Sequence, residues 1–229
     1  MTRIRFHGLL AALALAFATA CAPEAPSFID APSTSASRLD ASSWGSAGTM
    51  ASVRVDATAT LLRNGYVLVA GGGTSAAELY DPRTSRWFSL GAMATSRQRH
   101  TATLLASGKV LVVGGGTSVL ASAGAELFDP DTNSWSAATG LDLPRTQHTA
   151  TLLPDGRVLV AGGDSGFGNA LSSVMLYSPA THSWSVTGPM SAARLGHAAT
   201  LLPDGQVLVT GGRDSANGNV LATAERYDP

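Results

Sequence analysis

The chain has 229 residues, of which 45% are hydrophobic and 14% are charged, and its formal net charge at pH 7 is -1. This composition fits a packed globular or repeat protein and argues against disorder of the whole chain. The basic residues are almost all arginines scattered along the chain, with Lys109 as the only lysine. Because they form no basic patch, the sequence gives no indication of nucleic-acid binding.

Residues 1–20 have the pattern of a signal peptide: two early arginines, an apolar run from Gly8 to Ala18 and a small-residue cleavage site ending at Ala20. Cys21, the only cysteine, follows immediately. This arrangement resembles the lipobox of bacterial lipoproteins, in which that cysteine is lipidated. We therefore expect an exported lipoprotein of the bacterial envelope, anchored to the membrane only through Cys21. Secretion after ordinary signal-peptidase cleavage is the alternative.

Residues 21–42 are rich in alanine, proline and serine and contain few large apolar side chains. Such a segment buries too little surface to offset its ordering entropy. We expect it to act as a flexible tether between the anchor and the rest of the chain.

From residue 43 onward the sequence repeats. One motif, Arg-x-x-His followed by a run ending in Thr-Leu-Leu, occupies residues 97–105, 145–153 and 194–202, and a fourth copy at 54–62 has Ala57 in place of histidine. The equivalent positions are 57, 100, 148 and 197, so the period is 43, 48 and then 49 residues. Periods of about 40 to 50 residues are typical of β-propeller blades.

Residues 148–196 show the content of one repeat. Two short apolar segments flank the turn at Pro154-Asp155-Gly156, and the second ends at Gly162-Gly163. Residues 174–178 and 181–186 then form two further strand-like segments around another turn. The sequence therefore predicts an all-β propeller of four-stranded antiparallel blades, near residues 57–99, 100–147, 148–196 and 197–229.

Three features of these repeats resemble the kelch family: a glycine doublet after the second strand, an aromatic residue before the turn that follows the third strand, and a tryptophan that opens the fourth. The doublets are Gly71-Gly72, Gly114-Gly115, Gly162-Gly163 and Gly211-Gly212. The aromatic residues are Tyr80, Phe128, Tyr177 and Tyr227, and the tryptophans are Trp87, Trp135 and Trp184. The resemblance covers residues 43–229 and implies a kelch-type propeller like the central domain of galactose oxidase.

Trp44 lies 13 residues before Ala57, the spacing that also separates Trp87 from His100. Residues 43–47 therefore resemble a fourth strand without its own blade, and in a closed four-bladed ring they would complete the blade of residues 197–229. Because kelch rings usually have more than four blades, we expect these blades to be part of a larger ring of six or seven. A closed four-bladed ring is the alternative.

Three kinds of side chain recur once in each repeat and invite functional interpretations. The histidines suggest a metal site, the arginines an anion-binding ring and the tryptophans a platform for carbohydrate. Because a feature repeated in every blade more often holds the array together, we assign them to structure instead and predict no metal, cofactor or catalytic residue. This structural set comprises Arg97, His100, Arg145, His148, Arg194, His197, Trp87, Trp135 and Trp184.

The loop after each glycine doublet does not repeat. Strand directions place these loops on the same face as the connections between blades, and variable polar loops on one rigid face often bind ligands. Drift of a surface loop is the alternative, and the acidic and amide residues match no EF-hand spacing. The candidate ligand-binding residues are Thr74, Ser75, Thr117, Ser118, Asp164, Phe167, Asn169, Arg213, Asp214, Asn217 and Asn219.

The repeats also resemble those of copper-radical oxidases, whose cofactor requires a cysteine cross-linked to a tyrosine. The repeats contain no cysteine, and the chain contains no Gly-x-Ser-x-Gly or His-Glu-x-x-His motif. We therefore expect a non-enzymatic binding module on the bacterial cell envelope, which presents its loop-rich face to a protein or a glycan. A structural or adhesive surface repeat protein is the alternative, and a fragment of a propeller enzyme is less favoured.

Overall fold

The computed structural model describes residues 43–117 and 120–229. The predicted signal peptide, tether and lipidation site at Cys21 lie outside these residues, as does Ser118. All regular secondary structure in the described part is β, in agreement with the predicted fold class.

Within the described residues, no helix has the length and apolar character needed to cross a bilayer.

The strands form four antiparallel sheets, and in each sheet the strands are adjacent in chain order. The first sheet contains β1 (Thr58–Leu61), β2 (Val67–Ala70), β3 (Ala77–Asp81) and β4 (Arg86–Ser89). The second contains β5 (Thr101–Leu104), β6 (Val110–Val113), β7 (Ala125–Asp129) and β8 (Ser134–Ala138). The third contains β9 (Thr149–Leu152), β10 (Val158–Ala161), β11 (Val174–Ser178) and β12 (Ser183–Thr187). The fourth contains β13 (Ala198–Leu201), β14 (Val207–Thr210) and β15 (Ala224–Tyr227).

The first two strands of each blade are joined by a tight hairpin whose glycine has a left-handed backbone. In the third blade, Gly156 has a φ of 86° and its N–H donates to the carbonyl of Leu153. A left-handed conformation costs glycine little because it has no Cβ atom. The apolar run that follows then forms a strand buried on both faces, as β10 shows over its whole length.

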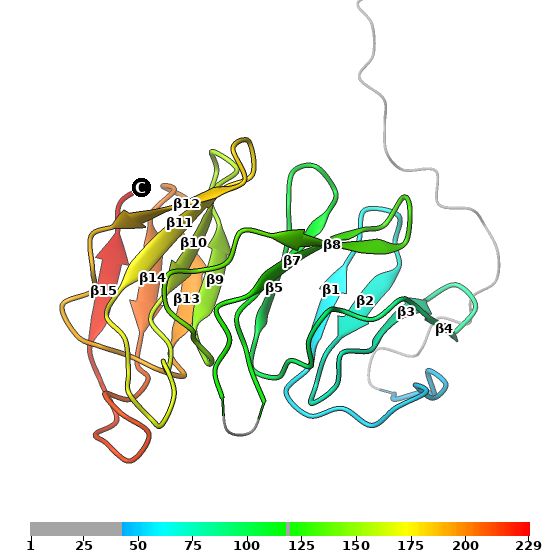
Figure 1. Cartoon of the computed structure of the whole chain (residues 1–229), viewed down its shortest axis with the longest axis horizontal. Coiled ribbons are helices and arrows are strands. Elements are labelled where there is room, and N and C mark those ends of the chain that lie inside the picture. The colour runs from blue at the N-terminus through cyan, green and yellow to red at the C-terminus, as the bar shows by residue number, and fades with distance from the viewer. Residues whose placement is uncertain (1–42, 118–119) are drawn as a thin grey trace, which may run out of the picture. The chain divides into compact units, whose positions relative to one another are not determined.

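The four sheets lie side by side in chain order, and their innermost strands, β1, β5, β9 and β13, contact one another consecutively (Figure 1). The hydrophobic core lies between neighbouring sheets rather than within one of them. One cluster joins the first and second blades, another joins the second and third, and another joins the third and fourth. Each blade therefore depends on its neighbours for burial, as expected of a propeller.

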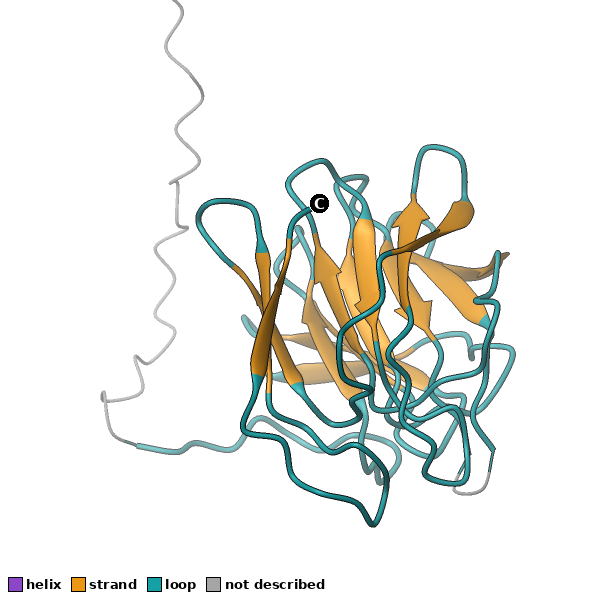
Figure 2. Cartoon of the chain, turned by 90° about the vertical axis from the view of Figure 1, so that its left-hand side faces the viewer, coloured by secondary structure: helices purple, strands orange, loops and turns teal. Residues whose placement is uncertain are grey.

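The two ends of the strands differ. Short turns join β1 to β2 and β3 to β4 at one end of the strands. Longer loops gather at the other end of the strands (Figure 2). At this second end, Thr146 of a connection between blades forms a β-bridge with Asp164 of a β10–β11 loop, and Leu195 forms one with Arg213. The candidate binding loops thus share a face with the connections between blades, as the strand directions required.

Residues 43–47 do not form the strand that was expected to close the last blade. The carbonyl of Ala47 instead accepts a hydrogen bond of 2.9 Å from Trp87 Nε1, which ties this segment to the first blade. Figure 1 shows the first and fourth sheets at opposite ends of the row. A segment held beside the first blade does not reach β15 of the same chain in this arrangement.

Candidate functional site

A buried arginine precedes the innermost strand of each blade. Arg97 Nη1 donates to the carbonyls of Gly114 (2.6 Å) and Gly124 (2.9 Å), and its Nη2 donates to Glu126 Oε1 (2.9 Å). The other carboxylate oxygen of Glu126 accepts from the Ala94 N–H. The guanidinium therefore joins the glycine doublet to the third strand of its blade, and its donors are directed at the protein rather than at an external anion. Arg54 with Glu78, and Arg194 with Glu225, repeat this arrangement.

The third blade departs from this arrangement, because Met175 occupies the position that a glutamate holds in the others. Arg145 is fully buried and donates to the carbonyls of Gly162 and Ser173. The nearest carboxylate is Asp142, with its oxygen 3.7 Å from Nη2 and its side chain about half exposed. Burial accordingly lowers the pKa of Arg145, and Asp142 only partly opposes this effect.

The three repeated histidines lie between adjacent blades. His148 Nε2 is 2.9 Å from the hydroxyl of Thr101 on the innermost strand of the preceding blade. His100 pairs in the same way with Thr58, and His197 with Thr149. Burial, together with the nearby arginine, lowers the pKa of His148 to about 3, and those of His100 and His197 to about 4. The imidazoles are therefore neutral at physiological pH.

The glycine doublets make room for these histidines. A Cβ atom at Gly114 would lie 2.7 Å from Cε1 of His148 in the next blade and 2.6 Å from the carbonyl oxygen of Arg145. A Cβ atom at Gly115 would lie 2.6 Å from Cβ of His100 in its own blade. Both positions thus require glycine for packing as well as for their left-handed backbone.

The tryptophans pack over the outer part of each contact between blades. Trp135 packs on Phe128 with ring centroids 5.1 Å apart, and its Nε1 donates to the carbonyl of Gly91 in the preceding blade at 2.9 Å. Trp184 donates to Thr139 in the same way. The arginine, histidine, glycine and tryptophan positions together form a repeated contact, which we call the seam.

The seam contains no metal-type cluster in the described residues, since no three histidine, cysteine, aspartate or glutamate side chains are grouped as ligands. Nε2 of each histidine pairs with the hydroxyl of a threonine in the preceding blade. The arrangement suits packing rather than coordination.

A second repeated element lies on the loop face, immediately before each innermost strand, and it was not expected from the sequence. Asp56, Arg99 and Gln147 all have φ between 54° and 58°, and Gly196 has φ of 62°. The N–H of Arg99 donates to the Asp56 carbonyl, that of Gln147 to the Arg99 carbonyl, and that of Gly196 to the Gln147 carbonyl. Backbone hydrogen bonds therefore link the four blades in a ladder, and the side chains of these positions vary. The sequence carried one indication of this ladder: the residue directly before the histidine position varies within an otherwise constant motif.

Beside this ladder is a small pocket of about 70 Å³, between the loops of the second and third blades. Gln98 and Arg99 line it from one connection, Thr146 from the next, and Asp164 with Phe167 from the β10–β11 loop. Leu120 and Thr117 line it from the β6–β7 connection. Phe167 is 91% exposed and Leu120 63% exposed, so the mouth of the pocket is flanked by two apolar side chains.

The remaining candidate loop residues lie apart from this pocket. Asp214 accepts hydrogen bonds from the backbone and side chain of Asn219, and Arg213 pairs through its backbone with Leu195. The loops of the third and fourth blades meet where the Ala216 N–H donates to the Gly168 carbonyl. Of the predicted binding residues, the pocket therefore brings together Thr117, Asp164 and Phe167. Those outside it, among the described residues, are Thr74, Ser75, Asn169, Arg213, Asp214, Asn217 and Asn219.

Comparison with known protein families finds the Kelch motif over residues 145–191, about one repeat of this chain. The matched segment includes the seam residues Arg145, His148 and Trp184, and Tyr177, on which Trp184 packs. No curated protein matches the sequence significantly. The motif and the four-bladed fold together support a kelch-repeat β-propeller.

Proposed function

We propose that this protein is a binding module whose loop face, centred on the pocket beside Phe167, docks a partner protein. The proposal is supported by the difference between the residues that hold the blades together and those around the pocket. The side chains of the seam contact one another, whereas those around the pocket are exposed, as at Arg99, Leu120 and Phe167, or half-buried, and they differ from blade to blade. Kelch-repeat domains are typically binding modules rather than enzymes, which agrees with this proposal.

The observation that carries the proposal is the exposed aromatic side chain of Phe167. It lies at a loop tip between Gly166 and Gly168, and its φ is 56°, a conformation that is unfavourable for a residue with a Cβ atom. Neither burial nor packing within the fold accounts for a phenylalanine at this position. With Arg99 beside it, the site combines an aromatic side chain with an arginine, two residue types that are enriched at protein interfaces.

The residues that line the pocket do not support catalysis. Asp164 is the only carboxylate among them, and its Oδ1 accepts a hydrogen bond from the Gly166 N–H. No histidine or second carboxylate is present among these lining residues to act with it as an acid–base pair. This supports a non-enzymatic role for the site.

The location of the protein is a separate proposal, which rests on the sequence around Cys21. We propose that the propeller is held on the bacterial envelope by a lipid on this cysteine, with residues 22–42 as the tether. Intact mass measurement of the protein isolated from membranes tests this, because lipidation adds the mass of acyl chains to the mature N-terminus. A free thiol at Cys21 in a secreted protein would contradict the anchor and leave the binding face unaffected.

The binding function is tested with the purified protein on two probes: a panel of purified envelope proteins and an array of glycans. We expect saturable binding to a protein in the panel, reduced about tenfold or more by Phe167→Ala. Val186→Ala, which truncates an exposed apolar side chain on the outer strand β12, is the matched control and should leave binding unchanged.

Binding only to glycans would replace the proposed partner class, with Phe167 as a stacking surface. Binding that survives exchange of residues 164–169 and 213–219 would contradict the proposed face. Absence of saturable binding to either probe would favour a structural or adhesive role.

A further inference from the structure

A groove of about 480 Å³ lies beside the outermost strand of the first blade, where this blade meets the second. Asn64 of the β1–β2 turn, Phe88 and Leu90 of β4 and the segment after it, and Pro130 and Asn133 of the β7–β8 turn line it. We call this the outer groove. Its volume is within the range of about 300–1,000 Å³ that is usual for small-molecule sites.

The outer groove is open because Gly91 stands where the next blade has a threonine. At the contact between the second and third blades, the hydroxyl of Thr139 donates to the carbonyl of His182 at 2.8 Å and bridges the two blades. By the period of the repeat, Gly91 corresponds to Thr139, and Asn133 corresponds to His182. Glycine has no hydroxyl, so the first and second blades lack this bridge.

Two aromatic side chains line the groove at positions that are not aromatic in the other blades. Phe88 is 44% exposed, and the equivalent residues are Ser136 and Ser185. Tyr66 is replaced by a lysine, an arginine and a glutamine in the three later blades. The fold of a blade therefore requires neither aromatic ring.

Tyr66 is held in position by residues that do not line the groove. The guanidinium of Arg83 lies 5.5 Å from the centroid of the Tyr66 ring, and its Nη2 donates to the tyrosine hydroxyl at 3.1 Å. Asp81 in turn accepts from Arg83 Nε at 3.2 Å. The ring is thus oriented before a ligand binds, which lowers the entropic cost of binding.

The polar side chains that line the groove are uncharged at neutral pH. Asn64 and Asn133 contribute amides. Asn64 Oδ1 accepts from the Tyr66 N–H, and its Nδ2 has no partner among the described residues. Lys109 and Asp129, which line the adjoining pocket, are paired with each other at 3.0 Å. The groove therefore combines aromatic surface with neutral hydrogen-bonding groups.

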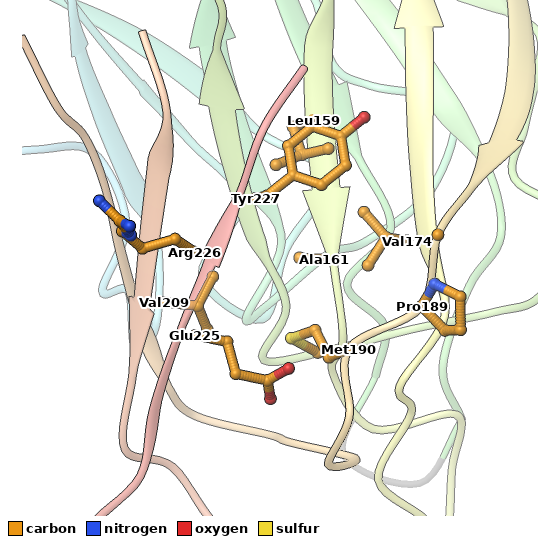
Figure 3. Close-up of a pocket in the computed structure, with 10 residues that line it drawn as sticks. Leu159, Ala161, Val174, Pro189, Met190, Val209, Glu225, Arg226 and Tyr227 are labelled. Carbon is orange, nitrogen blue, oxygen red and sulfur yellow. The ribbon is translucent and has the colours of Figure 1, made fainter. Parts of the chain in front are cut away.

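The pocket between the third and fourth blades lacks this combination (Figure 3). It has a volume of about 60 Å³, and apolar side chains such as Val174 and Met190 line it together with Glu225 and Arg226. No amide side chain is among its lining residues. The composition of the outer groove is thus not a general property of the contacts between blades.

We propose that the outer groove binds a neutral saccharide of one or two sugar rings. The C–H groups on one face of a sugar ring pack against an aromatic face, which Phe88 supplies. The sugar hydroxyls both donate and accept, and the amides of Asn64 and Asn133 match both roles. An anion would find no cation among the lining residues, and a wholly apolar ligand would leave the amides without partners.

This site is separate from the loop face, because the β1–β2 and β7–β8 turns lie at the opposite end of the strands from the pocket beside Phe167. A saccharide in the outer groove and a protein on the loop face would therefore bind independently. The two proposals can fail separately.

Saturation-transfer NMR on the full chain tests the proposal, with cellobiose, maltose, lactose and N,N′-diacetylchitobiose as probes. We expect saturable binding of at least one probe, with a dissociation constant raised about tenfold or more by Phe88→Ala. Phe167→Ala removes an exposed phenylalanine from the loop face and should leave this constant unchanged.

Absence of saturable binding to all four probes would overturn the proposal, as would binding that Phe88→Ala does not weaken. Binding lost in Phe167→Ala and kept in Phe88→Ala would assign the saccharide to the loop face and overturn the outer groove as its site.

Gly91→Thr separates loss of the site from loss of the fold. The new hydroxyl should bridge the first and second blades as Thr139 bridges the next two, which closes the groove and abolishes binding. A Cβ atom at Gly91 meets no atom within 4 Å, so the urea midpoint should not fall. Thr139→Gly, the matched control, should leave saccharide binding unchanged. Undiminished binding in folded Gly91→Thr would contradict the proposed site.

Asn64→Asp tests the amide alone. Aspartate keeps the acceptor for the Tyr66 N–H, as Asp155 does in the equivalent turn of the third blade, so the turn should be retained. It replaces the free amide donor with a carboxylate, and the dissociation constant of the saccharide should rise about tenfold. An unchanged constant would show that Asn64 does not contact the ligand and overturn the assigned binding mode.

Discussion

The seam and the loop face differ in how much the fold determines each side chain. At the seam, His148 contacts Thr101 of the preceding blade on one side and the second glycine of its own doublet on the other, so the preceding blade and its own blade both restrict the residue. On the loop face, Phe167 is 91% exposed and the fold requires neither its size nor its aromatic ring. Regular repetition therefore identifies the residues that hold the blades together, and departure from it identifies the residues available for binding.

The largest effect on the free energy of unfolding is expected for substitutions at the seam. Arg97→Met should lower the free energy of unfolding by about 3–5 kcal/mol, because it leaves the buried carboxylate of Glu126 without its partner. Arg145→Met should cost less, about 1–3 kcal/mol, because a methionine replaces the glutamate in that blade and carbonyl groups are the main acceptors. Urea unfolding measures both.

Arg99→Met is the control for this comparison, because its ion pair with Asp56 is half exposed and should contribute less than about 1 kcal/mol. Equal losses for Arg97→Met and Arg145→Met would contradict the role assigned to Glu126.

The next largest effect on the free energy of unfolding is expected at the glycine doublets. Gly114→Ala should cost about 2–4 kcal/mol, since its Cβ atom would overlap His148 and the Arg145 carbonyl in addition to adopting a left-handed backbone. Gly156→Ala has the same backbone requirement but no atom within 4 Å of the added Cβ, so it should cost about 1 kcal/mol. Thermal unfolding of the two variants isolates the packing contribution, and similar melting temperatures would argue against tight contact at the seam.

The buried histidines make stability depend on pH. An unfolded histidine binds a proton below its ordinary pKa of 6.5, whereas folded His148 does so only at about 3, because of burial and the nearby Arg145. The unfolded state therefore binds more protons as the pH falls from 6.5 toward 3, and the free energy of unfolding decreases through this window.

Between pH 7.5 and pH 5, the free energy of unfolding should fall by about 1–2 kcal/mol less in His148→Gln than in the wild-type protein. Urea unfolding midpoints of both proteins at pH 7.5 and pH 5 measure this difference. An unchanged pH dependence in the variant would show that His148 is accessible to protons in the folded state.

The smallest effect on stability is expected on the loop face. Phe167→Ala should change the free energy of unfolding by less than about 0.5 kcal/mol, because the side chain makes no buried contact. A calorimetric loss of about 2 kcal/mol or more would mean that this residue is structural, and the comparison between the two regions would then fail.

The seam and the blade architecture could be predicted from the sequence because each blade supplies an independent copy of the same pattern. The loop pocket could not, because Arg99, Leu120 and Asp164 come from three connections that only the packing of blades brings together. The ladder through Asp56, Arg99 and Gln147 escaped prediction for a different reason: arginine and glutamine give no sequence indication of a left-handed backbone, so the four positions do not look alike in the sequence.

The expected strand at residues 43–47 shows a further limit. The Ala47 carbonyl accepts a hydrogen bond from Trp87 Nε1, as the Gly91 carbonyl does from Trp135, but the spacing from Trp44 would put Gly48 in that place. Spacing within one chain does not specify which sheet edge a strand joins, because that depends on where the first and last blades lie in space.

The most direct test of the separation between seam and loop face is a paired measurement on His148→Ala and Phe167→Ala. Each variant would be measured for its urea midpoint and, at a temperature where both are folded, for its affinity to the protein probe identified from the panel. We predict that His148→Ala loses stability and retains affinity, whereas Phe167→Ala retains stability and loses affinity. Loss of affinity in His148→Ala while folded, with Phe167→Ala unaffected, would place the binding site at the seam and contradict this account.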